Sequence, residues 1–464
     1  MPVSLMKIIL MQLPIQGTDF FYSNENIPLA PACLKAVAAG QGKDVDLLPQ
    51  DLMPYGSDQA ILRFLLDGRP DIVGMSWYLW NLERSLFLAR QLHRKLPMCT
   101  VVLSGPEITP HNEFLLAHGE FDVGVVGQGE QGWEILLKFF PYVPDISGLL
   151  KRGGRGQWYF TGINENEPSV RDLSSPYLWG CLDSHPDKIL WLETVRGCLH
   201  QCAYCHYHKQ FKQPKPFPLD RVDADVGRAL EKGIEEIVFL DPCFAGRPGL
   251  EKLRDLPGKV SSERRLRFHA ELNAEDIDFT CAEKLGKIGF SQVEVGLQTI
   301  HRETLKMTHR RFRPRRFLQG MRSLQGHGIE VMGDLIAGLP GDKLEDIHKR
   351  MDWVLKHDAF DSLMLYPLSL LASPELHPHR SFLVFSRTQG LIWKWPDPRE
   401  SHSLELPDGQ KTPSHPVCCV ATSGEAIPEW FTNHMSKRYP SLPDMRLWRP
   451  PEDNTPTLNS SILG

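Results

Sequence analysis

The sequence of 464 residues is long enough for two or three domains, and its 41% hydrophobic and 23% charged residues are ordinary for a globular protein. The net charge of −5 excludes a strongly basic protein that binds polyanions over its whole surface. No apolar run approaches the ~20 residues of a membrane span. The apolar start of the chain leads into polar residues without a small-residue cleavage site, so we expect a cytoplasmic protein with reduced cysteines.

The first part of the chain alternates between apolar runs and helix-length segments. The apolar runs are typical of buried parallel strands and lie at 7–13, 44–48, 71–76, 99–104 and 121–126. Helices are predicted at 29–39, 57–67, 82–95 and 131–140. This alternation predicts an α/β fold with a flavodoxin-like, Rossmann-like sheet over residues 1–143.

Ligands of such sheets bind outside the carboxyl ends of the strands. The loops predicted there carry glycine turns or clustered aromatic residues, at 14–26, 77–81, 105–107 and 127–130. Glycine lets the backbone approach a bulky ligand closely. Turns after strands use glycine in any case, so these loops alone do not establish a ligand site.

The rest of the chain divides into three further regions. Residues 144–186 are rich in glycine, proline and serine, and we interpret them as a linker with a small hairpin. Over residues 187–375, strands are predicted at 188–195, 235–240, 266–271, 291–297, 330–336 and 362–367, and helices at 219–233, 249–261, 275–287, 301–325 and 342–356. These units predict a partial (βα)6 barrel with its active site at the carboxyl ends of the strands. Residues 376–464 are dense in proline, and we interpret them as a small α+β cap on the substrate side.

Three cysteines follow the first predicted barrel strand. Cys198, Cys202 and Cys205 form a C-x3-C-x2-C array. Cysteine thiolates hold iron–sulfur clusters, and three thiolates on one loop leave the fourth iron of a cubane open to chelate a small molecule. The alternative is a zinc knot of Cys202, Cys205 and a nearby histidine, but no second pair of zinc ligands follows.

This array resembles the cluster loop of the radical S-adenosylmethionine (SAM) enzymes. The resemblance implies that the three cysteines are the catalytic metal ligands of a [4Fe–4S] cluster, and that Tyr204, the aromatic residue before the last cysteine, lies beside the adenine of SAM. Further residues at the predicted strand ends match the motifs of this family to different degrees. The resemblance implies SAM contacts from Asp241, Glu271, Glu294, Gln298, Gly338 and Pro340, the last two within a G-L-P-G turn.

The first domain resembles the cobalamin-binding domain that precedes many radical SAM barrels. Turns similar to that family's occur at 104–107 (SGPE) and 127–130 (GQGE), and an aromatic loop follows the third strand. The resemblance implies cobalamin contacts from Ser76, Trp77, Tyr78, Asn81, Ser104, Gly105, Pro106, Glu107, Gly127, Gly129 and Glu130. The D-x-H-x-x-G motif that supplies a lower cobalt ligand is missing after the first strand, where Asp19 is followed by no histidine.

An arginine-rich run at 309–316 is open to two interpretations. It is typical of a solvated helix start in which Arg310 or Arg311 matches a family arginine for the SAM carboxylate, and a nucleic-acid contact is disfavoured. The adjacent Cys418 and Cys419 have no assigned role.

The two resemblances together imply a cobalamin-dependent radical SAM methyltransferase. One SAM would be cleaved to a 5′-deoxyadenosyl radical that abstracts hydrogen from an unactivated carbon of a small molecule or peptide. Another would methylate cobalamin, which then supplies the methyl group. An electron donor such as flavodoxin or ferredoxin is implied as a partner. The alternatives are a cobalamin-binding radical SAM enzyme for a non-methylating rearrangement or oxidative cyclisation, a tRNA-modifying methylthiotransferase-like enzyme, and a non-catalytic sensor.

Overall fold

The structure is a computed structural model that divides into two compact units, which are described separately. It describes residues 6–13, 27–49, 52, 58–78, 81–112, 115–116, 120–153, 156–162, 169–183, 188–207, 211, 213–246 and 266–368, together with five short strands beyond residue 390. No helix among these residues is long and apolar enough to cross a membrane.

The first unit is built on a seven-stranded sheet with the strand order β2-β1-β3-β4-β5-β6-β7. The first five strands run parallel: β1 (Ile8–Met11), β2 (Asp46–Leu47), β3 (Ile72–Ser76), β4 (Thr100–Ser104) and β5 (Val123–Val125). The order of these five strands is that of a flavodoxin-like sheet, which confirms the predicted fold class.

A hairpin extends this sheet beyond the predicted strands. β6 (Leu149–Arg152) pairs antiparallel with β5 and with β7 (Trp158–Phe160). The hairpin predicted within the linker therefore exists, but it is part of the first sheet. In this pairing Gly124 of β5 lies opposite Leu150 of β6. A Cβ on Gly124 would come within 3.3 Å of the Leu150 side chain.

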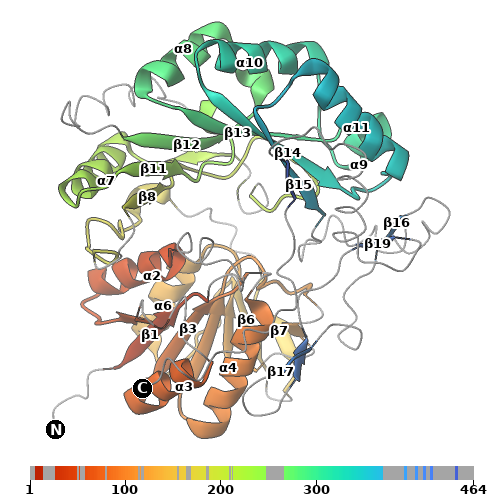
Figure 1. Cartoon of the computed structure of the whole chain (residues 1–464). Helices are drawn as coiled ribbons and strands as arrows, with labels where there is room; N and C mark the ends of the chain where they lie inside the picture. Colours follow the sequence, from red (N-terminus) through yellow and green to blue (C-terminus); the bar gives the residue numbers. More distant parts are fainter. Residues whose placement is uncertain are drawn as a thin grey trace, which may run out of the picture. The chain divides into compact units, whose positions relative to one another are not determined.

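Helices cover both faces of the first sheet (Figure 1). They are α2 (Leu29–Gly40) and α6 (Gly129–Phe139) on one face, and α3 (Asp58–Gly68) and α4 (Leu82–Lys95) on the other. Alternate residues of a strand point to opposite faces. Ile8 and Leu10 of β1 accordingly belong to the core under α2 and α6, whereas Ile9 and Met11 belong to the core under α3 and α4.

The second unit contains another seven-stranded sheet, with the order β20-β15-β14-β13-β12-β11-β8 and every pair parallel. Six of its strands match the predicted barrel strands: β8 (Ile189–Leu192), β11 (Glu236–Phe239), β12 (Arg267–Leu272), β13 (Gln292–Gln298), β14 (Glu330–Ala337) and β15 (Ser362–Pro367). The seventh, β20 (Met445–Leu447), pairs with β15 and comes from the region predicted as a cap. The sheet is therefore one strand wider than predicted.

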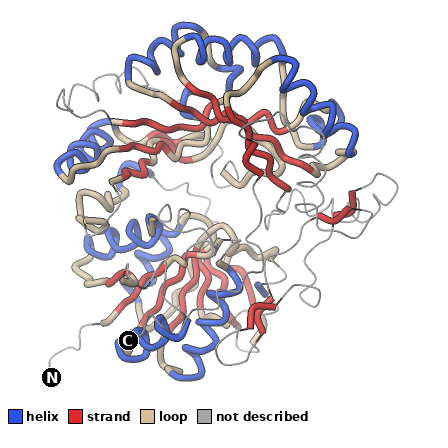
Figure 2. Tube along the Cα trace, viewed as in Figure 1, coloured by secondary structure: helices blue, strands red, loops and turns tan. Residues whose placement is uncertain are grey.

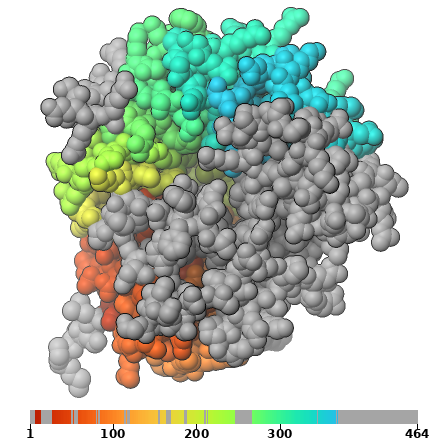
Figure 3. Space-filling model, viewed as in Figure 1, coloured from red at the N-terminus to blue at the C-terminus, as the bar shows by residue number. Residues whose placement is uncertain are grey.

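Helices line one side of this curved sheet (Figure 2). They are α7 (Leu219–Glu231), α8 (Phe279–Ile288), α9 (Arg302–Met307), α10 (Pro314–Gly326) and α11 (Leu344–His357), with the short 3-10 turns η2 (Phe244–Gly246) and η5 (Ala274–Asp276) after β11 and β12. The green-to-cyan surface in Figure 3 belongs to this helical layer. A single helix over 301–325 was predicted, and this was wrong: Pro314 opens a second helix at its first position, where proline is tolerated.

The region after residue 390 contributes two further short pairs. β16 (Leu391–Trp393) pairs antiparallel with β19 (Cys419–Ala421), and β17 (Ser403–Glu405) pairs with β18 (Lys411–Pro413). Three other predicted parts lie outside the described residues: the rest of the cap, Cys418, and the helix at 249–261. Residues 163–168, before the 3-10 turn η1 (Val170–Asp172), lie outside them too.

Candidate functional site

The connection from β8 to the cysteine loop is held in place by a buried carboxylate. Asp241, directly after β11, is 1% exposed and accepts hydrogen bonds from the backbone N–H groups of Thr194 and Val195 at 2.7 and 2.9 Å, and from the Thr194 hydroxyl. Its carboxylate therefore anchors the start of the loop beside β9 (Val195–Arg196). Gly197 follows at φ +87°, and a Cβ there would meet the Phe211 side chain at 2.9 Å, so the turn into the cysteines requires glycine.

The three predicted cluster cysteines lie together on this loop. Cys202 is buried, and Cys198 and Cys205 are half-buried. Burial, with the neighbouring cysteines adding to it, raises the pKa of Cys198 and of Cys205 to about 11. Without a metal these two groups are neutral thiols at neutral pH, so binding a cluster would release their protons.

Arg310 connects the cysteine loop to the barrel sheet. Its guanidinium donates to Cys202 Sγ at 3.7 Å, to the Tyr204 hydroxyl at 3.0 Å and to the main-chain oxygen of Gly296 on β13. Burial opposes the charge, but Tyr204 and Cys202 outweigh it and raise the pKa of Arg310. A permanent positive charge therefore lies against one cluster cysteine and the aromatic residue predicted to face adenine.

The open face of the barrel sheet carries a row of acidic side chains. Glu271 of β12 is in register with Glu294 of β13, and Gly296, two residues on, is in register with Asp334 of β14. Burial and hydrogen bonding to Glu294 raise the pKa of Asp334 to about 10. Burial also opposes the charge of Glu294, but His269 and Asp334 together outweigh it and lower the pKa of Glu294. Asp334 is therefore a proton donor to an ionised Glu294 at neutral pH. Asp334 was not predicted from the sequence.

A buried arginine fixes the next two strand ends. Arg350 of α11 is 0% exposed and pairs with both oxygens of Asp342 at 2.8 and 2.9 Å. It also donates to the main-chain oxygens of Gln298 and Ile336, at the ends of β13 and β14. Asp342 in turn accepts from the backbone N–H of Leu339. The G-L-P-G turn and the end of β13 are thus tied to one ion pair that the sequence analysis missed.

The strand ends held by Arg350 have unusual backbone geometry. Gln298 has φ +61° beside a register shift in β13, and Gly338 and Gly341 have φ +83° and +82°. The side-chain oxygen of Gln298 and one carboxyl oxygen of Asp334 are buried without a hydrogen-bond partner in the described part of the chain. Buried polar atoms normally have a partner, so these two are suited to the hydroxyl and ammonium groups of a ligand such as SAM.

Three of the four predicted ligand loops of the first unit follow neighbouring strand ends, and the fourth, at 14–26, lies outside the described residues. Ser76, Ser104 and Val125 are neighbours in register at the ends of β3, β4 and β5. Gly105 has φ +116°, and a Cβ there would lie 2.2 Å from the main-chain oxygen of Trp77, so only glycine fits. Gly127 has φ +86°, and a Cβ there would meet no atom within 4 Å. These strand ends therefore carry two glycine turns, and the first turn of α6 follows at Gly129 and Glu130.

Two predicted cobalamin contacts have side chains engaged within the protein. Asn81 is 1% exposed; its amide donates to the main-chain oxygens of Leu13 and Ser76 and accepts from the backbone N–H of Tyr78. It ties the ends of β1 and β3 together. Trp77 is fully buried in the core under α3 and α4, 6.2 Å from the Phe121 ring. Because its side chain belongs to this core, only its backbone is left for a ligand at the strand ends.

Glu107 ends the SGPE turn as a buried acid. It is 4% exposed, and burial raises its pKa to about 7. The Asn112 amide donates to its Oε2 at 3.3 Å and to its main-chain oxygen at 3.0 Å. Pro106, beside it, is half-buried. The turn is therefore fixed internally, and Glu107 lies within it.

A small cavity lies between the sheet and the helices α2 and α6. Small residues from the strand ends and the start of α6 line it together with aliphatic and aromatic side chains: Gly74, Ser76, Ser104, Gly129, Leu34 and Trp133 among them. The cavity lies directly below the strand ends that carry the glycine turns, because Ser76, Ser104 and Gly129 belong to its lining. The donor set and the glycine cradle fit a cobalamin, and the three thiols with the acidic barrel face fit a cluster and SAM.

Comparisons with known proteins agree with this geometry. Residues 22–137 match the B12 binding domain and residues 192–354 match the Radical SAM superfamily. The chain carries a B12-binding domain followed by a radical SAM domain. These two domains imply a [4Fe–4S] cluster, SAM and cobalamin as cofactors, which confirms the cofactors predicted from the sequence.

The similarity to known proteins is at low sequence identity. TokK of Streptomyces tokunonensis, a cobalamin-dependent radical SAM methyltransferase, is 24% identical over 68% of this chain and 50% of its own length. The hopanoid C-3 methylase of Methylococcus capsulatus is 24% identical over 71% of this chain and 65% of its own. The chain thus spans between half and two thirds of these relatives. The solved structure of TsrM from Kitasatospora setae has a TM-score of 0.69 at 17% identity, covering 93% of this chain and 89% of that one.

Proposed function

We propose that this protein methylates an unactivated carbon of a small molecule or peptide. One observation carries the proposal: the same chain has a three-cysteine loop at the strand ends of the barrel sheet and glycine turns at the strand ends of a flavodoxin-like sheet. When bound, the cluster with SAM would supply a 5′-deoxyadenosyl radical, and cobalamin would supply the methyl group. The methyltransferase names of TokK and the hopanoid C-3 methylase support this reaction class.

The residues of the chain would divide the work between the two units. Cys198, Cys202 and Cys205 would hold the cluster, with Arg310 fixing Cys202 and Tyr204. Glu294 would accept hydrogen bonds from the SAM ammonium or ribose, because it is the ionised member of the acidic row.

The remaining predicted SAM contacts have different supporting observations. The side-chain oxygen of Gln298 has no hydrogen-bond partner among the described residues. Gly338 and Pro340 belong to the turn in which Asp342 accepts from Leu339. Glu271 lies beside Glu294 on the open face of the sheet. We propose that these line the SAM site, and that Asp241 acts by positioning the cysteine loop.

In the first unit we propose that the turns at 104–107 and 127–130 and the small cavity hold cobalamin. Ser76, Ser104 and Gly129 would approach it most closely, because they line the cavity, and Gly105 would keep the turn after β4 close to the Trp77 backbone. Asn81, Trp77 and Glu107 would support these loops from within.

The reductant and the location complete the proposal. Radical SAM enzymes need a reductant, and we propose a small electron carrier such as flavodoxin or ferredoxin. A reducing cytoplasm is supported by the eight described cysteines, which are free of disulfides.

The test is anaerobic reconstitution of the full chain with iron, sulfide and hydroxocobalamin, followed by gel filtration and reaction with SAM and dithionite. We expect about one corrinoid and one cluster per chain, and formation of both 5′-deoxyadenosine and S-adenosylhomocysteine. Cys202→Ala should abolish 5′-deoxyadenosine, whereas the control Cys281→Ala on α8 should not. Retained corrinoid with 5′-deoxyadenosine but no S-adenosylhomocysteine would replace methyl transfer by a rearrangement or cyclisation. An active Cys202→Ala protein would overturn the radical chemistry altogether.

A further inference from the structure

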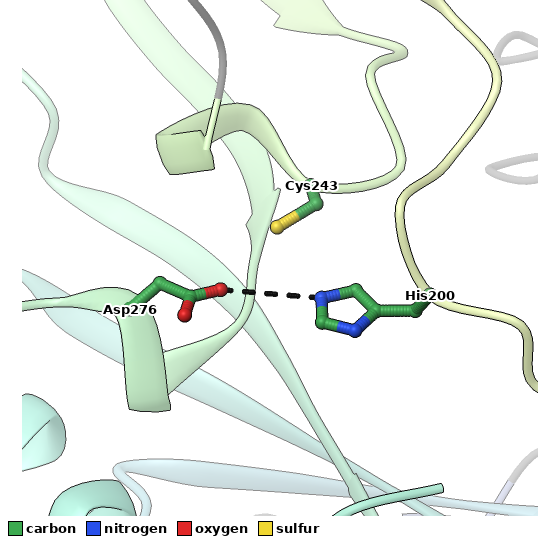
Figure 4. Close-up of side chains that lie close together, drawn as sticks. All are labelled: His200, Cys243 and Asp276. Carbon is green, nitrogen blue, oxygen red and sulfur yellow. Dashed lines mark ion pairs between the residues drawn. The ribbon is translucent and has the colours of Figure 1, made fainter. Parts of the chain in front are cut away.

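Beside the cysteine loop, three side chains bring different ligand atoms to one point. His200, Cys243 and Asp276 each offer one atom, and these atoms all lie within 4.8 Å of one another (Figure 4). His200 comes from the loop after β9, Cys243 from the turn after β11, and Asp276 ends η5 after β12. β8, β11 and β12 are adjacent and parallel, so the three residues meet because their strands end at the same edge.

The hydrogen bonds around His200 indicate which ring atom is available. The Asn273 side-chain oxygen accepts from the backbone N–H of Glu275 at 3.2 Å, which fixes the orientation of its amide. The Asn273 Nδ2 therefore faces His200 Nε2, at 3.2 Å, and donates to it. A nitrogen that accepts a hydrogen bond carries a lone pair. Nε2 is also the ring atom near Asp276, 3.9 Å from its Oδ2, so a metal ion bound to Nε2 would take the place of the Asn273 hydrogen bond.

Asp276 does not complete a hydrogen bond with the ring. Its Oδ2 lies 3.9 Å from His200 Nε2, which is beyond hydrogen-bond distance. An imidazole lone pair, a carboxylate oxygen and a cysteine sulfur therefore converge as acceptors. The His200 and Asp276 side chains are 43% and 41% exposed, so an ion can reach them from solvent.

We propose that His200, Cys243 and Asp276 form a mononuclear site for a borderline divalent transition-metal ion, zinc or ferrous iron. Thiolate, imidazole and carboxylate together select these ions, whereas magnesium and calcium prefer oxygen ligands alone. Three protein ligands leave one position of a tetrahedron open, as in catalytic zinc sites. The site uses none of Cys198, Cys202 and Cys205 but adjoins them, because the backbone N–H of His200 donates to Cys198 Sγ at 3.4 Å. Its open position would bind an oxygen or nitrogen atom of a substrate at the barrel mouth.

The test uses the reconstituted holoenzyme and zinc ions, and needs no turnover. After gel filtration the protein is dialysed against micromolar zinc, and bound zinc is measured by elemental analysis and by X-ray absorption at the zinc edge, which iron does not obscure. We expect about one zinc per chain, with one sulfur at about 2.3 Å and nitrogen or oxygen at about 2.0 Å. Cys243→Ser should remove the sulfur signal, and Cys243→Ser, His200→Gln and Asp276→Asn should each weaken zinc binding at least tenfold.

The cluster and a second cysteine provide the controls. The iron content and the spectrum of the reduced cluster should be unchanged in all three variants, which also shows that they fold. Cys33→Ser, a half-buried thiol of α2, should bind zinc as the unaltered protein does. Reconstitution with iron-57 alone should give a mononuclear ferrous signal that Cys243→Ser removes. The proposal is overturned by absence of zinc binding, by zinc without sulfur, or by a Cys243→Ser protein that loses its cluster, because Cys243 would then be a cluster ligand.

Discussion

The buried carboxyl of Glu107 allows a quantitative test of the first unit. Burial raises its pKa from 4.5 to about 7, which corresponds to about 3 kcal/mol between the charged and neutral forms. The pKa of Glu107 is higher in the folded protein than in the unfolded chain. Its contribution to the free energy of unfolding is therefore fully present below pH 4.5 and is lost as the pH rises from 4.5 to 7. Glu107→Gln keeps the size and an acceptor for Asn112 but cannot ionise.

Glu107→Gln should therefore stabilise the protein increasingly as the pH rises from 4.5 to 7, and by a constant amount above pH 7. At pH 8 we expect a free energy of unfolding about 3 kcal/mol above that of the unaltered protein, and at pH 5 a difference within about 1 kcal/mol. The measurement is urea unfolding of the full chain at both pH values, followed by tryptophan fluorescence. Glu120→Gln, at an exposed carboxylate before β5, should change little at either pH. Equal effects of Glu107→Gln at pH 5 and pH 8 would refute the argument that burial dominates this carboxyl.

Three further substitutions test the other parts of the site. Arg350→Met leaves Asp342 as an unpaired buried charge, so it should cost about 3–5 kcal/mol in urea unfolding and weaken SAM binding; adding Asp342→Asn should recover part of the stability. Gly105→Ala places a Cβ against the Trp77 carbonyl at positive φ, and should cost more than about 1 kcal/mol and reduce corrinoid retention after gel filtration. Arg310→Gln removes a positive charge beside a cluster cysteine, and should lower the midpoint potential of the cluster by on the order of 100 mV, whereas Arg310→Lys should not. An unchanged potential in Arg310→Gln would show that the charge is screened.

The strands of the first sheet could be predicted because they are covered on both faces and form continuous apolar runs. In the second sheet, β12 and β13 alternate between buried and more exposed residues, which is the other strand pattern visible in a sequence. The runs at 71–76 and 99–104 became β3 and β4 with bounds shifted by at most one residue. The hairpin β6–β7 was visible as a hairpin, but its pairing with β5 was not, because nothing in a local pattern specifies a long-range edge partner. For the same reason β20 was not predicted as the seventh strand of the barrel sheet: its residues lie in the region that was predicted as a cap.

The sites show a similar division between location and role. The cysteine array and the glycine turns are local patterns, so they can be located directly in the sequence. Asn81 and Asp241 were also predicted as ligand contacts, yet hydrogen bonds to neighbouring backbone engage their side chains. Arg350, at the other extreme, lies on an ordinary amphipathic helix, and only the fold brings it to the strand ends. A pattern thus predicts where a ligand can bind, but which atoms remain available for it depends on the bonds that the folded chain makes within itself.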